Sequence, residues 1–455
     1  MPRLLDVIEE KIAWFWNFRL PEALRRDLDL GSPTTPAMGN RVKVVVGVRR
    51  CGKTWRMYQE IARLESMGID RHRILYFNFD DERLRPYDRL LPSQVMEAFY
   101  TLSPASREGA YLFFDEVQDV PDWGVFMRRM VDTENLTCYV TGSSSRMLSG
   151  EVATEFRGRA TRFELTPYSF SEYARLHGRD GLVVTAGSPA RTEQDRLDLA
   201  RMLRTYLVEG GFPEAQGLEP TESIEMLQDI AANVVTADVV ERNDFSSMRI
   251  ARVVASQCLA SSARKLSITK LSNRLKSAGM GMGWERLDSL VGYLEDANLM
   301  YRVPEYSTSA SENSRKAQKV YANDQSLVLA VSPSTSVDRG LALETVVYLE
   351  LRRRHSVGRK HEIMTFAIPS GGGTLEVDFV KGDRLFDTAV DLVQVCERMD
   401  DEKTRRREIR ALERAMELAG QHEGTIVALS GSEEIESAAG TIRVVPAWQW
   451  LLSGE

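Results

Sequence analysis

The sequence is poor in cysteine and histidine, and it has no long uninterrupted apolar run. Its four cysteines, at positions 51, 138, 258 and 396, are far apart and form no Cys-x-x-Cys pair, which argues against a clustered zinc site and a disulfide framework and fits a reducing compartment. Five scattered histidines give no basis for a Ser-His-Asp triad. Since no stretch reaches the roughly 18 apolar residues of a membrane-spanning helix, we expect a soluble, cytoplasmic protein without a membrane partner.

Charge of one sign is not in large excess either. The 59 Lys and Arg residues against 66 Asp and Glu residues leave a net charge of −7, so any nucleic-acid-binding surface has to be a local patch. With 43% hydrophobic and 27% charged residues, the composition is that of a globular protein and excludes a disordered or fibrous chain. At about 150 residues per domain, the 455 residues predict roughly three domains.

A glycine-rich segment carries the clearest chemical signal. Residues 47–54, GVRRCGKT, match G-x-x-x-x-G-K-[ST] directly after the apolar run VKVVV and before a helical pattern. Such a loop turns backbone N–H groups inward, and the helix that follows adds the positive end of its dipole. We predict a site for ATP with Mg²⁺, in which Lys53 bridges the β- and γ-phosphates and Thr54 ligates the metal. The expected nucleotide-contacting residues are Gly47, Arg49, Arg50, Cys51, Gly52, Lys53, Thr54 and Trp55.

A second apolar run ends in two adjacent carboxylates. Residues 111–116 read YLFFDE, the arrangement of a Walker B strand. We expect Asp115 to hold Mg²⁺ through water and Glu116 to act as the general base that polarises the attacking water. Lys53 and Glu116 are thus the predicted catalytic residues that a chain supplies to its own site.

Two later segments carry further polar candidates. Ser143, in the run TGSSS, either senses the γ-phosphate or belongs to an ordinary turn. Arg157 and Arg159, in the segment FRGR, either stabilise the transferred phosphoryl charge in a neighbouring copy, which requires an oligomer, or are surface charge. Both alternatives stay open.

The order of apolar runs and helical patterns predicts an α/β protein. The short runs VKVVVG, ILYFNF, AYLFFDE and TCYVTGSS alternate with helical segments, which indicates a parallel sheet covered on both faces. We expect five parts: an N-terminal helical segment (1–40), a P-loop ATPase domain (41–165), a helical lid or connector (166–245), a winged-helix module (246–323) and an α/β C-terminal domain (324–455).

Several segments, taken in order, resemble the AAA-type ATPases of archaea and bacteria. They are GVRRCGKT, YFNFDDERL, LFFDEVQDVPDW, VTGSSSRMLSGE, RGRATRFELTPYSFSEY and EGGFPE, followed by LALETVVYLEL, EVDFV, LVQVC and DEKTRRREIRAL. The resemblance covers most of the chain from about residue 41 onward. It implies ATP binding and hydrolysis on a P-loop fold, followed by a C-terminal domain of unknown function.

The middle of the chain fits a helix-turn-helix plan with a wing. Helical patterns cover residues 246–262, 268–277 and 284–297, and the wing spans residues 299–321. In a DNA-reading module, basic residues of the wing would meet phosphates, here Arg302, Arg315, Lys316 and Lys319. The third helix is acidic and repels phosphate, so protein docking or a lid role is the alternative. The basic second helix, with Lys270, Arg274 and Lys276, keeps DNA contact open.

The C-terminal part resembles a restriction-endonuclease-like fold. Glu344 on a helix and Asp378 in the strand segment EVD match positions that hold a divalent metal in active members. A later segment reads Gln394-Val395-Cys396 instead of Glu-x-Lys, so a weak ligand replaces a carboxylate and Cys396 supplies no ammonium. The domain is either a nuclease or, as we favour, a scaffold that has lost its chemistry. The arginine-rich helix 401–419 is expected to be a salt-bridged surface, with a phosphate-facing patch as the alternative.

Together these patterns predict a Mg²⁺-dependent ATPase whose nucleotide state rearranges the lid, the winged-helix module and the nuclease-like domain. Its expected partners are ATP and ADP, DNA through the winged-helix or C-terminal domain, and a second copy of the chain or another protein. Two alternatives stay open: a slow nucleotide-operated switch that docks a protein or DNA, and an ATP-gated metal-dependent nuclease.

Overall fold

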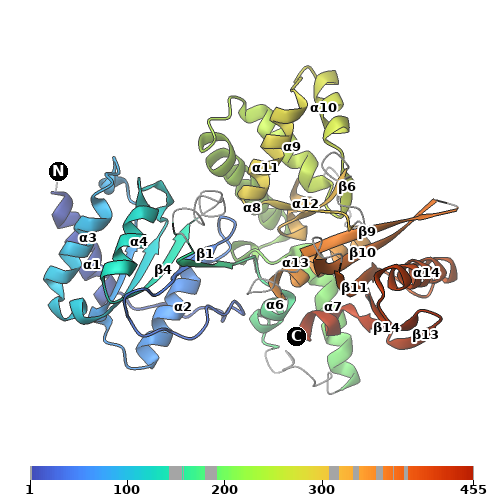
Figure 1. Ribbon diagram of the computed structural model, residues 1–455, viewed down its shortest axis with the longest axis horizontal. Helices are drawn as coiled ribbons and strands as arrows, with labels where there is room; N and C mark the ends of the chain where they lie inside the picture. Colours follow the sequence, from blue (N-terminus) through green and yellow to red (C-terminus); the bar gives the residue numbers. More distant parts are fainter. Residues whose placement is uncertain are drawn as a thin grey trace. The chain divides into compact units, whose positions relative to one another are not determined.

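The chain forms two compact units, Met1–Thr166 and Pro167–Glu455, each with its own β-structure and core (Figure 1). The computed structural model describes residues 3–142, 156, 158–179, 192–306, 317–331, 338–354, 362–371, 373–383 and 388–453. Within these ranges, every helix is too short or too polar to cross a membrane.

Unit 1 is a five-stranded parallel sheet in the order β2-β3-β4-β1-β5. The four predicted strands are confirmed, and β5 is a half-exposed edge strand that lacks an apolar run. Its elements are α1 (Leu4–Asn17), β1 (Val42–Val46), α2 (Lys53–Ser66), η1 (Arg71–Arg73), β2 (Ile74–Asn78), η2 (Glu82–Leu84), α3 (Leu91–Leu102), η3 (Pro104–Glu108), β3 (Ala110–Asp115), η4 (Val117–Asp119), α4 (Trp123–Thr133), β4 (Leu136–Gly142) and β5 (Ala160–Glu164).

Helices cover both faces of this sheet, as predicted (Figure 1). Helices α1, α3 and α4 share one apolar core with alternate residues of β1 to β4, and α2 packs on the opposite face. The N-terminal helix α1 buries Val7, Ile8, Ile12 and Phe15, whereas Leu5 is 50% exposed. The N-terminal segment is therefore part of the first compact unit.

The strand order brings three strand ends together at one edge of the sheet. β4 lies between β1 and β3, with Val46 of β1 beside Gly142 and Phe114 of β3 beside Val140. Because all the strands are parallel, their carboxyl ends meet at the same edge. The loop after β1 and the carboxylates at the end of β3 therefore lie next to each other, with the end of β4 between them.

Unit 2 begins with a helical region that carries a small antiparallel sheet in the order β6-β8-β7. The helical patterns predicted at 246–262, 268–277 and 284–297 are present as α9, α10 and α11, and the predicted ribbon contains β7 and β8. The elements are α6 (Phe170–Leu176), α7 (Glu193–Glu209), η7 (Pro213–Ala215), α8 (Pro220–Asn233), the π-helix η8 (Val234–Glu241), α9 (Met248–Ala260), β6 (Arg264–Leu266), α10 (Ile268–Ser277), α11 (Trp284–Asp296), β7 (Met300–Val303), β8 (Gln318–Ala322) and α12 (Gln325–Val331).

A mixed six-stranded sheet in the order β13-β14-β12-β11-β10-β9 completes unit 2. β11, β12 and β14 are parallel, and the other pairs are antiparallel. Helix α14 packs on one face, and α13 and α15 share a core with the other. The elements are α13 (Arg339–Arg354), β9 (Glu362–Ser370), β10 (Gly373–Asp383), β11 (Thr388–Cys396), α14 (Glu402–Ala419), β12 (Glu423–Ala428), β13 (Glu433–Ser437), β14 (Gly440–Pro446) and α15 (Ala447–Leu452).

Candidate functional site

The loop between β1 and α2 has a backbone that two glycines make possible. Gly47 is pressed against the chain after β5, because a Cβ there would lie 2.1 Å from the Leu165 carbonyl oxygen. Gly52 precedes α2 with φ of +97°, a conformation that glycine adopts without strain. Since α2 begins at Lys53, the first N–H groups of the helix lack partners within it and supply a partial positive charge at the loop. This is a ready-made anion site.

Lys53 is folded back on the loop. Its side chain is buried, and Nζ donates hydrogen bonds to the carbonyl oxygens of Gly47 and Val48 at 3.0 and 3.2 Å. The ammonium therefore lies within the curl of the loop, where the sequence predicts that phosphate oxygens bind.

The other residues predicted to contact nucleotide differ in exposure. Cys51 is fully buried, and burial raises the pKa of its thiol. Arg49 is half-buried, and Arg50 is exposed with a left-handed φ of +64°. Trp55 is 46% exposed on α2, with its ring centroid 6.3 Å from that of Tyr58. Arg49, Arg50 and Cys51 belong to the loop and Trp55 follows it on α2. Their contact with a nucleotide stays a prediction.

Asp115 is buried at the end of β3 and accepts three hydroxyl hydrogen bonds. Thr54 Oγ1 donates to Asp115 Oδ2 at 2.7 Å, and the Tyr76 hydroxyl donates to the same oxygen at 2.8 Å. The hydroxyl of Thr141, at the end of β4, donates to the other oxygen. Burial, and next the charge of Glu116, raise the pKa of Asp115. The two predicted metal ligands, Thr54 and Asp115, are thus in direct contact.

This donor set fits Mg²⁺, which prefers carboxylate and other oxygen ligands. Thr54 and Asp115 would hold the ion, which would supply positive charge for the phosphate oxygens. Tyr76 and Thr141, which the sequence did not single out, donate hydrogen bonds to the Asp115 carboxylate and fix its orientation.

Glu116 adopts a left-handed conformation, with φ of +54°. This is uncommon outside glycine and turns the chain sharply at the end of β3. The Gln118 amide donates from Nε2 to Glu116 Oε2 at 2.7 Å. Gln118 is 2% exposed, and within the described residues its Oε1 has no hydrogen-bond partner. Glu116 is therefore held by a buried amide that sequence reasoning missed.

A buried arginine from the N-terminal segment also contacts the loop. Arg26 donates to the Cys51 carbonyl oxygen at 2.7 Å and to the Thr166 carbonyl oxygen at 2.6 Å. Leu165 is bonded to the same region, since its N–H donates to the Val46 carbonyl oxygen at 2.8 Å. The last residues of unit 1 are thus hydrogen-bonded to the loop between β1 and α2, residues 47–52, which is called the phosphate loop below.

Of the remaining predicted residues, Ser143 and Arg157 lie outside the described part of the chain. Arg159 pairs with Asp132 of α4, and its carbonyl oxygen accepts the N–H of Val42 at 2.8 Å. Val42 begins β1, so Arg159 is at the end of the sheet opposite the phosphate loop. A role for either arginine in a neighbouring copy stays a prediction.

Residues 39–174 match a family model described as an AAA domain. The chain carries an AAA-type P-loop ATPase domain. Residues 200–338 match a second model, described as a domain of unknown function (DUF8612). That match begins inside α7, covers the rest of the helical region and the three-stranded sheet of unit 2, and ends immediately before α13.

Two relatives of this AAA-type ATPase are uncharacterized proteins. One, from Methanocaldococcus jannaschii, is 28% identical over 440 residues, which cover 95% of this chain and 92% of that protein. One from Haemophilus influenzae is 26% identical over 314 residues, 69% of this chain and 74% of that protein. Among solved structures, the Walker-type ATPase PABY2304 of Pyrococcus abyssi matches with a TM-score of 0.39 and 13% identity, over 64% of this chain and 91% of that one. The Aeropyrum pernix ORC1 protein in complex with DNA matches with a TM-score of 0.28 and 15% identity, over 73% and 92%.

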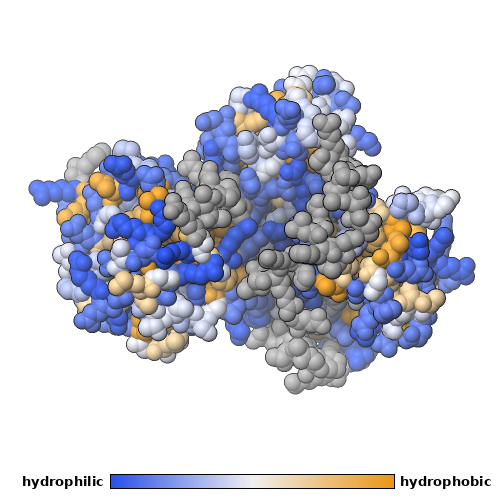
Figure 2. All heavy atoms as spheres, in the orientation of Figure 1, coloured by the Kyte–Doolittle hydropathy of each residue, from blue (hydrophilic) through white to orange (hydrophobic). Residues whose placement is uncertain are grey.

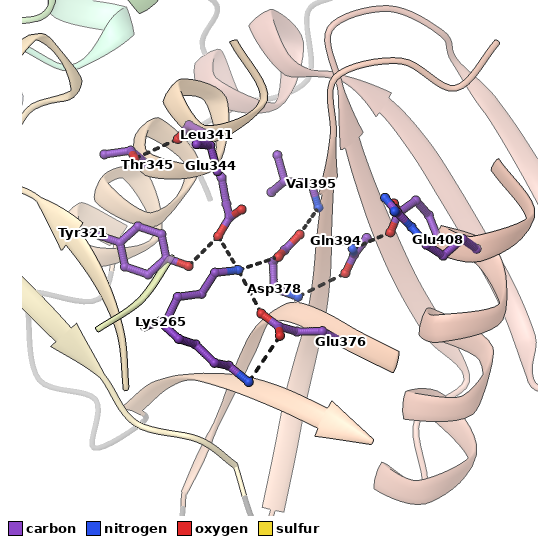
Figure 3. A network of polar contacts seen from close by, with 12 residues as sticks. Lys265, Tyr321, Leu341, Glu344, Thr345, Glu376, Asp378, Gln394, Val395 and Glu408 are labelled. Atoms are coloured by element: carbon purple, nitrogen blue, oxygen red, sulfur yellow. Dashed lines mark hydrogen bonds and ion pairs between the residues drawn. The ribbon is translucent and has the colours of Figure 1, made fainter. Parts of the chain in front are cut away.

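The ATPase chain has a second polar cluster, in unit 2 (Figure 3). Glu344 of α13 and Asp378 of β10, the predicted metal ligands, both contact the ammonium of Lys319, with N–O distances of 2.6 and 2.9 Å. Glu376 of β10 joins them at 3.0 Å. Gln394 instead donates from Nε2 to Glu408 of α14 at 2.6 Å.

Two of the four basic residues expected in a DNA-contacting wing are engaged within the protein. Lys319 is buried in the carboxylate cluster, so its assignment to DNA phosphate was wrong. Arg302 pairs with Asp288 at 2.7 Å and with Glu295, both on α11, because the acidic face of that helix packs beside β7. It is therefore not a free phosphate contact. Arg315 and Lys316 lie outside the described residues.

The arginines of α14 form the salt-bridged surface that the sequence favoured. Arg405, Arg406 and Arg407 pair with acidic residues of α14 and β13, which are Glu433, Glu402 and Glu408, respectively. All four cysteines are free and buried.

Proposed function

We propose that unit 1 hydrolyses ATP with Mg²⁺, with Lys53 at the β- and γ-phosphates, Thr54 and Asp115 on the metal and Glu116 as the base that orients water. The observation that carries the proposal is the 2.7 Å hydrogen bond between Thr54 and Asp115. It brings the start of α2 and the end of β3 together, so that the base, the next residue along, adjoins the metal ligands. Positioned charges and a general base are what phosphoryl transfer to water requires.

Two variants test the assignment. Lys53→Ala is expected to abolish turnover and weaken nucleotide binding, since it removes the cation of the loop. Glu116→Gln is expected to keep nucleotide binding and lower kcat by about 10²- to 10⁴-fold, the usual contribution of a general base. Lys403→Ala, at an exposed position of α14, is the control for a lost surface lysine. Unchanged turnover in Lys53→Ala would overturn the assignment, whereas tight nucleotide binding without turnover in the natural chain would identify a switch.

We further propose that the nucleotide cycle moves the end of unit 1. The Arg26 guanidinium bridges the Cys51 and Thr166 carbonyl oxygens, so a shift of the phosphate loop on ATP binding changes the position of Thr166. Hydrogen exchange of residues 160–170, with and without a non-hydrolysable ATP analogue, measures this coupling. Arg26→Ala is expected to remove the nucleotide-dependent protection. Arg41→Ala is the matched control, because Arg41 donates to the Ala160 carbonyl at the other end of β5.

DNA is the second partner that the proposal includes, through unit 2. The order α9, β6, α10, α11, β7 and β8 is that of a winged helix, and α10 presents exposed Lys270, Arg274 and Lys276. Since α11 is acidic, we expect DNA phosphates to contact α10. Fluorescence anisotropy with duplex DNA tests this: Lys270→Glu with Lys276→Glu should weaken binding and reduce its salt dependence. ATPase rates with and without DNA, on samples whose mass is measured with and without nucleotide, test stimulation and assembly.

A further inference from the structure

The cluster in unit 2 gathers three carboxylates from two elements. Glu344 lies in the middle of α13, and Glu376 and Asp378 lie two residues apart on β10 (Figure 3). Glu344 and Asp378 are buried, and Glu376 is half-buried. Carboxylates brought together away from water repel one another, so a cation among them stabilises the cluster.

The chain supplies that cation from the neighbouring sheet. Lys319 of β8 is 6% exposed, and its Nζ lies 2.6 Å from Glu344, 2.9 Å from Asp378 and 3.0 Å from Glu376. The ammonium therefore lies at the centre of the three carboxylates, within ion-pair distance of each.

Two neighbours of Lys319 complete this arrangement. Tyr321, two residues along β8 and on the same side of the strand, donates its hydroxyl to Glu344 Oε1 at 2.7 Å. Lys265, directly across from Lys319 on β6, reaches the second oxygen of Glu376 at 3.4 Å. The small sheet thus presents two ammonium groups and a phenol to the carboxylates.

The groups that would complete a metal site are committed elsewhere. Asp378 Oδ2 accepts the Val395 N–H at 3.0 Å. Gln394 accepts the Asp378 N–H through Oε1 and donates through Nε2 to Glu408. The Cys396 thiol donates to the Arg398 carbonyl oxygen at 3.1 Å. With Lys319 in place, no three His, Cys, Asp or Glu side chains of the described residues are arranged to hold a metal ion.

We infer that Lys319 is the resident cation of the Glu344–Glu376–Asp378 site and excludes divalent metal from it. The restriction-endonuclease-like resemblance implies a metal at this place, and the donor set does not fit one while the ammonium is present. A cavity of about 650 Å³, lined by Glu344 and Glu408 among others, opens beside the site, so solvent metal reaches it once the ammonium is withdrawn.

Manganese titration of the full chain without nucleotide tests this inference, with bound Mn²⁺ counted by electron paramagnetic resonance. The natural chain and Lys265→Met are expected to bind the same number of ions. Lys319→Met is expected to bind one more ion. Its affinity at the Glu344–Glu376–Asp378 site should be on the order of tenfold or more above that of the same site in the natural chain. The double variant Lys319→Met with Asp378→Asn is expected to lose this additional ion. Any Mn²⁺ site at the phosphate loop is common to all four proteins and cancels in the comparison.

Two results would overturn the inference. One is a natural chain that binds Mn²⁺ in a way that Asp378→Asn abolishes, which includes Mn²⁺-dependent DNA cleavage lost in that variant. The other is a folded Lys319→Met protein that gains no ion. Should Lys319→Met be poorly folded, thermal unfolding decides: Mn²⁺ should raise its Tm by more than it raises that of the natural chain, and equal shifts would contradict the inference.

Discussion

Gln118 offers a sharp test of how Glu116, the proposed general base, is held. Its Nε2 donates a 2.7 Å hydrogen bond to Glu116, and its Oε1 is buried without a partner among the described residues. Gln118→Leu keeps the volume of the side chain and removes both polar atoms. Catalysis and folding should therefore respond in different ways.

The size of each response follows from the two ends of the amide. A hydrogen bond to a charged group contributes about 1.5–3 kcal/mol, so kcat should fall by about 10- to 100-fold if the bond orients Glu116 in the transition state. KM should change little, because the phosphate loop is untouched. The lost bond destabilises the fold, but removing an unpaired buried carbonyl returns about 1–3 kcal/mol of desolvation. The two offset, so the Tm should move by only a few degrees.

Steady-state ATP hydrolysis, analogue binding by calorimetry and thermal unfolding on one preparation measure all three quantities. Gln94→Leu makes the same chemical change at an exposed position of α3 and should leave them unaltered. A Gln118→Leu protein whose kcat stays within about twofold of the natural value would refute the positioning argument. A variant in which KM rises and kcat stays the same would also refute it.

Three further changes probe the framework of the two units. Gly47→Ala forces a Cβ to 2.1 Å from a backbone oxygen, so it should destabilise unit 1 by about 1–3 kcal/mol and abolish nucleotide binding; unaltered calorimetric affinity would contradict this. The Arg83 guanidinium holds the pKa of Asp81 well below its usual value of 3.8. The ionised carboxylate therefore stabilises the fold above pH 3.8, and this stabilisation is lost as the pH falls through the lowered pKa. Asp81→Asn removes this carboxylate. It should therefore cost about 1–2 kcal/mol in urea unfolding near pH 7, a cost that shrinks toward about pH 2. Arg302→Met leaves Glu295 half-buried without its cation and should cost about 2 kcal/mol, an effect that Glu295→Gln in the same chain partly reverses.

Features carried by contiguous residues could be predicted from the sequence. The phosphate loop, the strand ending in Asp115 and Glu116 and the helices α9 to α11 each occupy one uninterrupted pattern, so period and composition were sufficient. Strands such as β5 and β13 were missed because edge strands alternate weakly and are largely exposed.

Features assembled from distant segments could not be predicted in that way. Arg26 reaches the phosphate loop from an extended segment without periodicity, and only the folded chain shows that its guanidinium is buried. The sequence pattern placed Lys319 among the basic residues of the wing, because it does not show that β8 packs against β10. The missing lysine at Cys396 was identified correctly, but the chain places an ammonium in the cluster from another strand.

The burial of all four cysteines has a practical consequence for spectroscopy. Burial raises the pKa of each thiol, to about 12 for Cys258 and about 11 for Cys396, and alkylating reagents attack the thiolate. A cysteine introduced on the surface should therefore take a maleimide dye while the native ones stay unmodified. Slow modification of Cys51, measured as mass added over hours, would then report how often the phosphate loop opens.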